Sequence, residues 1–219
     1  MEKFVQEGLI ERSLWLVRLR WIAVIGVIFT VLFVNQILKL PLPTTALYTI
    51  ALILGLYNLA FFILLGRIRK KESQDIFLPA NRIANLQICF DLNSLAFLIH
   101  FSGGIENPFI FYFVFHMIIA SILLSRRASF LQATYAILLF SSFVILEYSG
   151  VLPHYCLKGF IIYNQHNNPF YITGVSFVFI TTLYIAVYMA TSITKRLREQ
   201  EKNLRQANEL LEEKDRIKS

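Results

Sequence analysis

The sequence has little charge, few cysteines and few prolines. Of its 219 residues, 16% are charged, two are cysteine and six are proline. Two cysteines cannot form the framework of a disulfide-rich secreted domain, and soluble domains carry about 25% charged residues. Hydrophobic residues make up 56% of the chain, more than a water-soluble core of this size needs. The composition therefore predicts an integral membrane protein.

Six apolar runs lie between the clusters of charge, each near the ~20 residues that a helix needs to cross a bilayer. They cover Trp21–Ile37, Thr44–Leu65, Ile83–Phe101, Phe109–Leu124, Phe130–Leu152 and Pro169–Ile193. The expected fold class is an all-α integral membrane protein with six transmembrane helices followed by a cytoplasmic coiled-coil helix. The expected parts are a juxtamembrane segment (1–20), a six-helix transmembrane domain (21–194) and a cytoplasmic helix (195–219).

Basic residues predict the orientation, because Lys and Arg in short loops are retained on the cytoplasmic side. On one side lie Lys3, Arg12, Arg18, Arg20, Arg67, Arg69, Lys70, Lys71, Arg82, Arg126 and Arg127. The opposite connections hold only Lys39 and Lys158. Both termini are therefore expected in the cytoplasm. The net charge of +7 reflects this topology and attraction to anionic membrane lipid, and it implies no nucleic-acid partner.

The first 20 residues are too charged for the apolar core of a cleavable signal peptide. Apolar and charged side chains are interleaved in this segment. That pattern favours a short helix lying on the inner membrane surface before the chain turns into the first span.

The third span is unusually polar for a membrane helix. Its polar side chains are Asn85, Gln87, Asp91, Asn93 and Ser94. They fall on two sides of a helix, so this helix is expected in the middle of the bundle. An acidic residue inside the membrane is costly enough to mark function, and Asp91 and Glu147 are candidate proton-responsive groups. The alternative for Asp91 is hydrogen bonding to the hydroxyls of the sixth span, at Ser176, Thr181 and Thr182.

A short loop between the third and fourth spans has the sequence Gly-Gly-Ile-Glu-Asn-Pro-Phe, residues 103–109. Two glycines favour a tight reversal, Asn107 is a good N-cap, and Pro108 suits the first position of a helix. The segment predicts a well-formed turn into the fourth span. Asn-Pro-Phe recurs at 168–170, before the sixth span, so these three residues are partly a helix-start signal.

An aromatic stripe continues along the fourth span. Phe109, Tyr112 and His116 follow one another at helical spacing, which places them on one face below the loop. Flat apolar rings with one hydrogen-bond donor suit a quinone, which needs a surface for its ring and a partner for a carbonyl. The alternative is packing, because the chain contains 20 phenylalanines.

The loop resembles the quinone-responsive GGxxNPF segment of RegB/PrrB-type redox-sensing histidine kinases. Residues 19–24 resemble the start of the first span in that family, and residues 212–219 resemble the linker before its phosphorylated helix. The resemblance implies a bacterial inner-membrane sensor of membrane redox state, with quinone as ligand and no covalent cofactor. The implied binding residues are Gly103, Gly104, Asn107, Pro108, Phe109, Tyr112 and His116.

The remaining histidines and cysteines give no ligand pattern at this stage. His100 and His116 lie at different depths, which argues against ligation of one haem. His154 and His166 lack a metal-binding spacing, so no metal is expected. Cys89 falls inside a span whereas Cys156 falls in an outer loop, so a disulfide between them is not expected.

After the sixth span the sequence becomes highly charged, with Leu197, Leu204 and Leu211 at seven-residue intervals. This heptad pattern predicts a parallel, homodimeric coiled coil. The resemblance implies a cytoplasmic kinase region beyond Ser219 and a response regulator as its partner. No histidine follows His166 and no nucleotide-binding motif is present, so no residue of this sequence is expected to be catalytic.

Other functions remain open at this stage. A small proton-coupled transporter would use Asp91 as its central charge, but such proteins have helices broken at midplane. Here the Gly and Pro residues cluster at the ends of spans, which counts against a transporter. A membrane scaffold, or a sensor with a different cytoplasmic output, is also compatible with the composition.

Overall fold

The computed structural model describes residues 2–69, 77–156 and 165–218, and every regular element in these ranges is helical. The basic positions 70 and 71 and residues 157–164 of the outer segment before α6, which include Lys158, lie outside the described residues. The elements are α1 Glu2–Gln36, α2 Thr44–Arg69, α3 Phe77–His100, η1 Gly104–Glu106, η2 Pro108–Phe111, α4 Tyr112–Leu123, α5 Arg126–Tyr148, η3 Gln165–Asn167 and α6 Pro169–Lys218.

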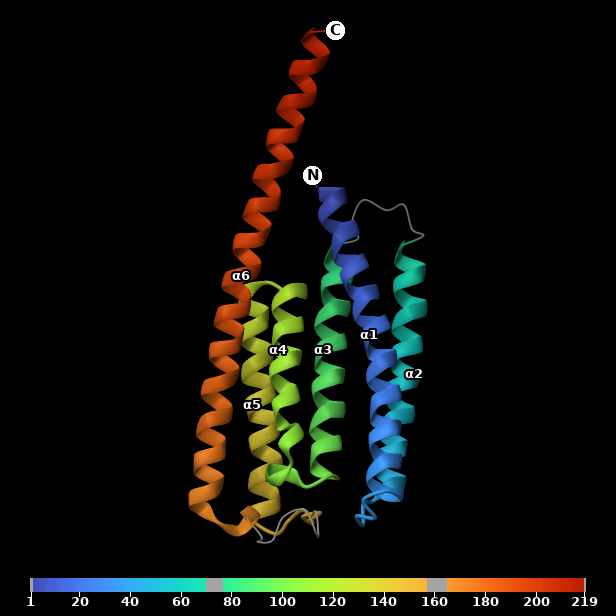
Figure 1. Cartoon of the computed structure of the whole chain (residues 1–219), viewed down its shortest axis with the longest axis vertical. Helices are drawn as coiled ribbons and strands as arrows, with labels where there is room; N and C mark the ends of the chain where they lie inside the picture. The colour runs from blue at the N-terminus through green and yellow to red at the C-terminus, as the bar shows by residue number, and fades with distance from the viewer. Residues whose placement is uncertain (1, 70–76, 157–164, 219) are drawn as a thin grey trace.

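The long helices form one bundle with α3 at its centre (Figure 1). The α3 helix contacts α1 and α2 on one side and α4 and α5 on the other, while α6 packs against α4 and α5. In its apolar stretch 61% of residues are buried, compared with 39% in α5, the next highest. The central position predicted from the polarity of this helix is therefore confirmed.

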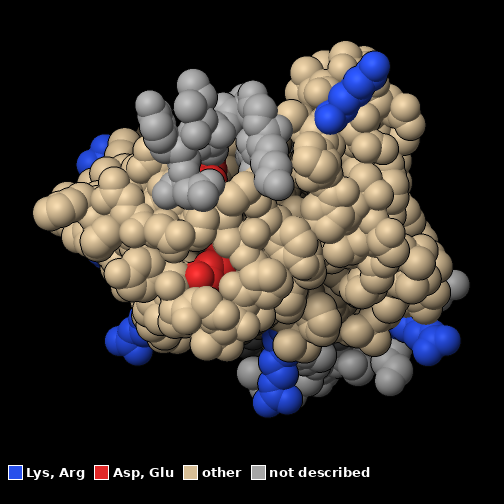
Figure 2. Space-filling view, turned by 90° about the horizontal axis from the view of Figure 1, so that it is seen from below, with Lys and Arg blue, Asp and Glu red and all other residues tan. Residues whose placement is uncertain are grey.

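Within the described part of the chain, five helices are long and apolar enough to cross a membrane, and the apolar stretch Pro108–Leu123 is shorter. The all-α membrane fold is therefore confirmed. Both ends of the chain lie at one end of the bundle (Figure 1). Figure 2 shows the opposite end, which we call the distal end: Lys and Arg lie toward its rim, and acidic atoms show nearer its middle.

The helix α1 differs from the sequence-based expectation. It runs without a break from Glu2 to Gln36, and Ser13, Leu16, Val17 and Arg20 are buried in the bundle. The helix makes no turn between the juxtamembrane segment and the first span, and residues 2–36 contain no proline that would end it. The apolar stretch of this helix begins at Ile10, well before the expected start at Trp21.

The turn into the fourth span is confirmed. Gly103 and Gly104 both have positive φ, at 120° and 53°, which favours glycine. Asn107 accepts a hydrogen bond from the backbone N of Phe109 at 2.8 Å, and its Nδ2 donates to the Ser102 carbonyl at 2.7 Å. Its side chain therefore ties the loop to the end of α3 and opens the next helix.

The last helix, α6, is 50 residues long. At 1.5 Å per residue it extends about 75 Å, more than twice the ~30 Å of a bilayer's hydrocarbon core. Its C-terminal part projects beyond the other helices (Figure 1). Leu197, Leu204 and Leu211 are 59%, 64% and 61% exposed on this projection.

Candidate functional site

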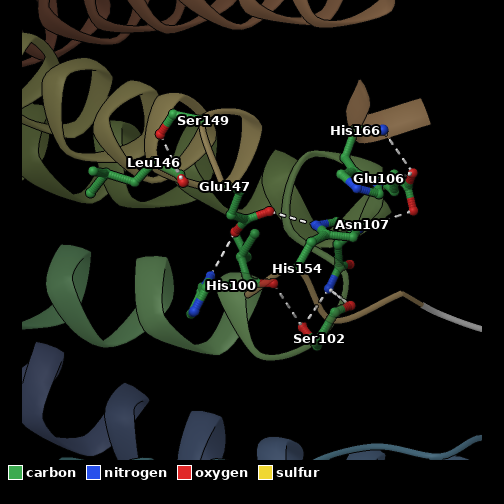
Figure 3. A network of polar contacts seen from close by, with 10 residues as sticks. His100, Ser102, Glu106, Asn107, Leu146, Glu147, Ser149, His154 and His166 are labelled. Atoms are coloured by element: carbon green, nitrogen blue, oxygen red, sulfur yellow. Dashed lines mark hydrogen bonds and ion pairs between the residues drawn. The ribbon is translucent and has the colours of Figure 1, made fainter. Parts of the chain in front are cut away.

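A cluster of acidic and imidazole side chains lies at the distal end, where α3, η1, α5 and η3 meet (Figure 3). We call it the distal cluster. Its members are His100, Glu106, Glu147, His154 and His166. They come from α3, η1, α5, the segment that follows α5, and η3, and no sequence spacing indicated that they would meet.

Glu147 is the centre of the distal cluster. One carboxylate oxygen lies 2.6 Å from Nδ1 of His100, and the other lies 2.6 Å from Nδ1 of His154. Glu147 and His100 are 5% and 4% exposed. A carboxylate only accepts hydrogen bonds, so both imidazoles donate to it through Nδ1. Sequence reasoning singled out Glu147, but it did not identify these partners.

Glu106 is the second buried carboxylate of the distal cluster. It accepts a hydrogen bond from the backbone N of His166 at 2.9 Å, and Nε2 of His154 lies 3.4 Å from its other oxygen. His154 therefore lies between two carboxylates. Burial lowers the pKa of His154, but the hydrogen bond to Glu147 and the charges of Glu147 and Glu106 outweigh it and leave that pKa raised.

The rings of His154 and His166 are stacked, with centroids 3.8 Å apart and planes inclined by 16°. Burial lowers the pKa of His166, and the adjacent His154 lowers it further. Nδ1 of His166 is buried and has no hydrogen-bond partner among the described residues. It lies 3.6 Å from Glu106.

Gly104 connects the short loop to the distal cluster. A Cβ built on it would lie against the carboxylate of Glu147, with Cδ only 3.0 Å away. The absence of a side chain therefore lets Glu147 approach the loop backbone. From the sequence, Gly104 was explained only by the tight turn. The structure gives a second reason, which is the close packing of Glu147 against this residue.

A buried ion pair lies deeper in the bundle. Nε and Nη2 of Arg20 donate to the two carboxylate oxygens of Asp91 at 2.7 and 2.8 Å. Nη1 of Arg20 donates to Asn58 Oδ1 at 2.8 Å, and the hydroxyl of Tyr57 donates to Asp91 at 2.7 Å. The hydroxyls of the sixth span are not the partners of Asp91, so that interpretation is wrong. The ion pair joins α1, α2 and α3.

A groove of about 350 Å³ lies between the 103–109 loop with α4 and the first turns of α6. Asn107 and Pro108 line it together with Ile110, Tyr171, Gly174, Val175, Phe179 and Thr182, among others. The loop therefore faces the last helix directly.

Five of the seven residues predicted to bind quinone do not line this groove, namely Gly103, Gly104, Phe109, Tyr112 and His116. Phe109 and Tyr112 are 43% and 46% exposed, and their rings stack with centroids 5.4 Å apart. Nδ1 of His116 lies 2.9 Å from the Tyr112 carbonyl. Asn107 and Pro108 thus line the groove, Phe109, Tyr112 and His116 lie on η2 and α4 outside it, and the two glycines form the turn.

These features define a class of protein. A bundle of membrane-length helices has buried polar groups at its distal end, and its last helix continues far beyond the bundle at the other end. Such an arrangement is that of a transmembrane sensory domain.

The particular family follows from comparison with known proteins. The model of the PilS-like transmembrane domain matches residues 4–204, and the chain belongs to this family. The match supports an N-terminal membrane domain of a sensor kinase. Comparisons with curated proteins and with solved structures found no match.

Proposed function

We propose that this domain senses the redox state of the membrane quinone pool and controls a histidine kinase through α6. One observation carries the proposal: the quinone-type loop and the helix that leaves the membrane form opposite walls of the same groove. A ligand in the groove would contact both. The RegB/PrrB-type resemblance of the loop supplies the ligand class.

The lining of the groove suits a quinone. Ile110, Val175 and Phe179 offer apolar surface for the ring, and Thr182 and Tyr171 bring hydroxyl groups to the wall. Ligand sites of this size are mostly apolar with a few polar groups that fix orientation. The volume of about 350 Å³ is at the lower end of the usual range, so it fits a headgroup whose tail remains in lipid.

The proposed signal is a change in the position of α6. Quinone and quinol can shift the equilibrium between two helix arrangements only by their difference in affinity for them. A carbonyl accepts hydrogen bonds, whereas a hydroxyl also donates them, and the hydroxyls of Thr182 and Tyr171 can respond to that difference. The histidine that becomes phosphorylated would belong to a kinase region beyond Ser219.

Filling the groove should weaken quinone binding. A Cβ on Gly174 has no atom within 4 Å, so Gly174→Leu is expected to occupy the groove without a backbone clash and to weaken a quinone analogue at least tenfold, about 1.4 kcal/mol. Gly26→Leu is the matched control, because Gly26 lies on α1 and a Cβ there also meets nothing within 4 Å. Binding is measured on purified protein, with the melting temperature followed in parallel.

The exposed surface of α4 is tested separately. Phe109→Ala and His116→Leu reduce affinity if quinone binds beside the aromatic stripe, and they leave it unchanged if quinone occupies the groove. A loss in these two variants with normal binding by Gly174→Leu would move the site to the α4 surface. Normal binding by all three variants would overturn quinone sensing by this loop.

We propose that the domain controls the kinase as a dimer, and that this dimer forms along the projecting part of α6. Leu197, Leu204 and Leu211 are exposed at heptad spacing, and burying such a seam drives coiled-coil association. Single cysteines at these positions, in a background with Cys89 and Cys156 replaced by serine, are expected to cross-link in membranes.

The control for cross-linking is a cysteine at Gln206, which lies on the opposite side of the helix from Leu197 at 100° per residue. It is expected to cross-link much less. Equal cross-linking at Gln206 and at the leucines, or none at any position, would contradict the parallel coiled coil.

A further inference from the structure

We infer that Glu106, His154, Cys156 and His166 form a binding site for a divalent transition-metal ion, with Zn²⁺ as the best fit. One ligand atom from each residue lies within 4.8 Å of every other. Two imidazole nitrogens, one thiolate and one carboxylate oxygen are ligands that zinc prefers. The spacing of His154 and His166 in the sequence did not indicate a metal, but the fold brings both against Glu106 and Cys156.

The four ligand atoms are close to the arrangement that zinc requires. Tetrahedral zinc holds its ligands at about 2.0–2.3 Å, which places them roughly 3.3–3.8 Å apart. The observed limit of 4.8 Å needs a contraction of about 1 Å. Nitrogen and sulfur ligands also argue against Ca²⁺ and Mg²⁺, which select oxygen.

The orientation of His154 favours a metal ligand. Its Nδ1 lies 2.6 Å from Glu147, and its Nε2 is directed at Glu106, 3.4 Å away. A metal ion bound there would replace the proton between Nε2 and the Glu106 carboxylate and would bind both groups. A histidine held by a carboxylate through its other nitrogen is the usual outer shell of a zinc site.

His166 supplies an independent observation. Its Nδ1 is buried without a hydrogen-bond partner among the described residues, and it lies 3.6 Å from Glu106. A buried polar atom without a partner destabilises a fold, because it has lost its hydrogen bonds to water. Coordination of a metal would remove that penalty, because Nδ1 faces the same carboxylate as His154.

The site would connect two parts of the domain. Glu106 belongs to η1 beside the groove, whereas His166 belongs to η3, three residues before α6 begins. A bound ion would therefore tie the loop to the start of the last helix. Glu106 also lines the groove, whereas His154, Cys156 and His166 do not. The inference rests on these four ligands and not on quinone, so it is tested without quinone present.

Zinc binding is tested on the purified chain without a polyhistidine tag, in competition with a chromophoric chelator. We expect one Zn²⁺ per chain, and at least a tenfold lower affinity in Cys156→Ser and in His166→Gln, because each removes a ligand. Cys89→Ser is the matched control, because its thiol contacts Gln132 at 3.4 Å and lies outside the site. Unchanged affinity in both ligand variants would overturn the proposal.

Two measurements on the unmodified chain keep the test independent of variant folding. Zn²⁺ should slow alkylation of Cys156 without changing that of Cys89. Co²⁺ in place of Zn²⁺ should give a thiolate-to-metal charge-transfer band and the intense visible absorption of a tetrahedral site. Alkylation of Cys156 at the same rate with and without Zn²⁺, or a weak octahedral cobalt spectrum, would exclude this ligand set.

Discussion

Asp91→Ala is expected to destabilise the protein by about 3–5 kcal/mol, because it leaves a buried arginine without its counter-charge. Arg20 is 3% exposed, and both of its bonds to Asp91 are short. The free energy of unfolding is measured by titrating SDS into mixed micelles. A cost below about 1 kcal/mol would show that Arg20 reaches water or a lipid phosphate when Asp91 is absent.

Two controls separate the loss of the counter-charge from other effects. Asn93→Ala removes the hydrogen bond from Asn93 Nδ2 to the Tyr135 hydroxyl at 2.7 Å, and it is expected to destabilise by only about 0.6 kcal/mol. The double variant Arg20→Met/Asp91→Leu should be less destabilised than Asp91→Ala, because it leaves no charge unpaired. If the double variant lost as much stability as Arg20→Met and Asp91→Leu lose separately when added together, this explanation would be contradicted.

Gly104→Ala is expected to destabilise the protein by about 2–4 kcal/mol. The left-handed backbone at φ 53° disfavours any Cβ, and this Cβ would also displace the carboxylate of Glu147. That displacement breaks the hydrogen bonds of Glu147 to His100 and His154. The melting temperature and the SDS unfolding curve both report the loss.

Gly150→Ala is the matched control. Gly150 also has a positive φ, at 73°, but a Cβ there meets nothing within 4 Å. This substitution should cost only the backbone preference, about 1 kcal/mol. Equal effects at Gly104 and Gly150 would mean that Glu147 moves aside freely and that the carboxylate does not depend on the glycine.

The helices were predictable from their apolar runs, because five of these have the length and composition that a bilayer requires and the fourth span is apolar but shorter. The polarity of α3 also predicted its central place, since neither polar side can face lipid. The course of α1 was not predicted. Charged residues at positions 11, 12, 18 and 20 suggested a segment outside the bundle, but helical periodicity buries Leu16, Val17 and Arg20 on one face.

The partners within the site could not be predicted, because they come from segments far apart in the chain. Glu147 meets His100 across 47 residues, and His166 meets Glu106 across 60. One signal was available for the ion pair: Asn58 is a lone amide within an apolar run, and such residues usually have a polar partner inside the bundle. Pairing it with Arg20 still required the packing of α1 against α2.

The uninterrupted course of α6 constrains how a stimulus can travel. Sharp bends in helices arise mainly at proline, glycine or a bulge, and Pro169 and Gly174 both lie in the first two turns of α6. From residue 175 to 218 the helix has neither residue, and so it has no built-in hinge. A twist applied near the distal end should therefore reach the far end with little loss of angle. If α6 controls a kinase region as proposed above, the signal would be a rotation of the helix about its axis, and the direction of that rotation would distinguish the two states.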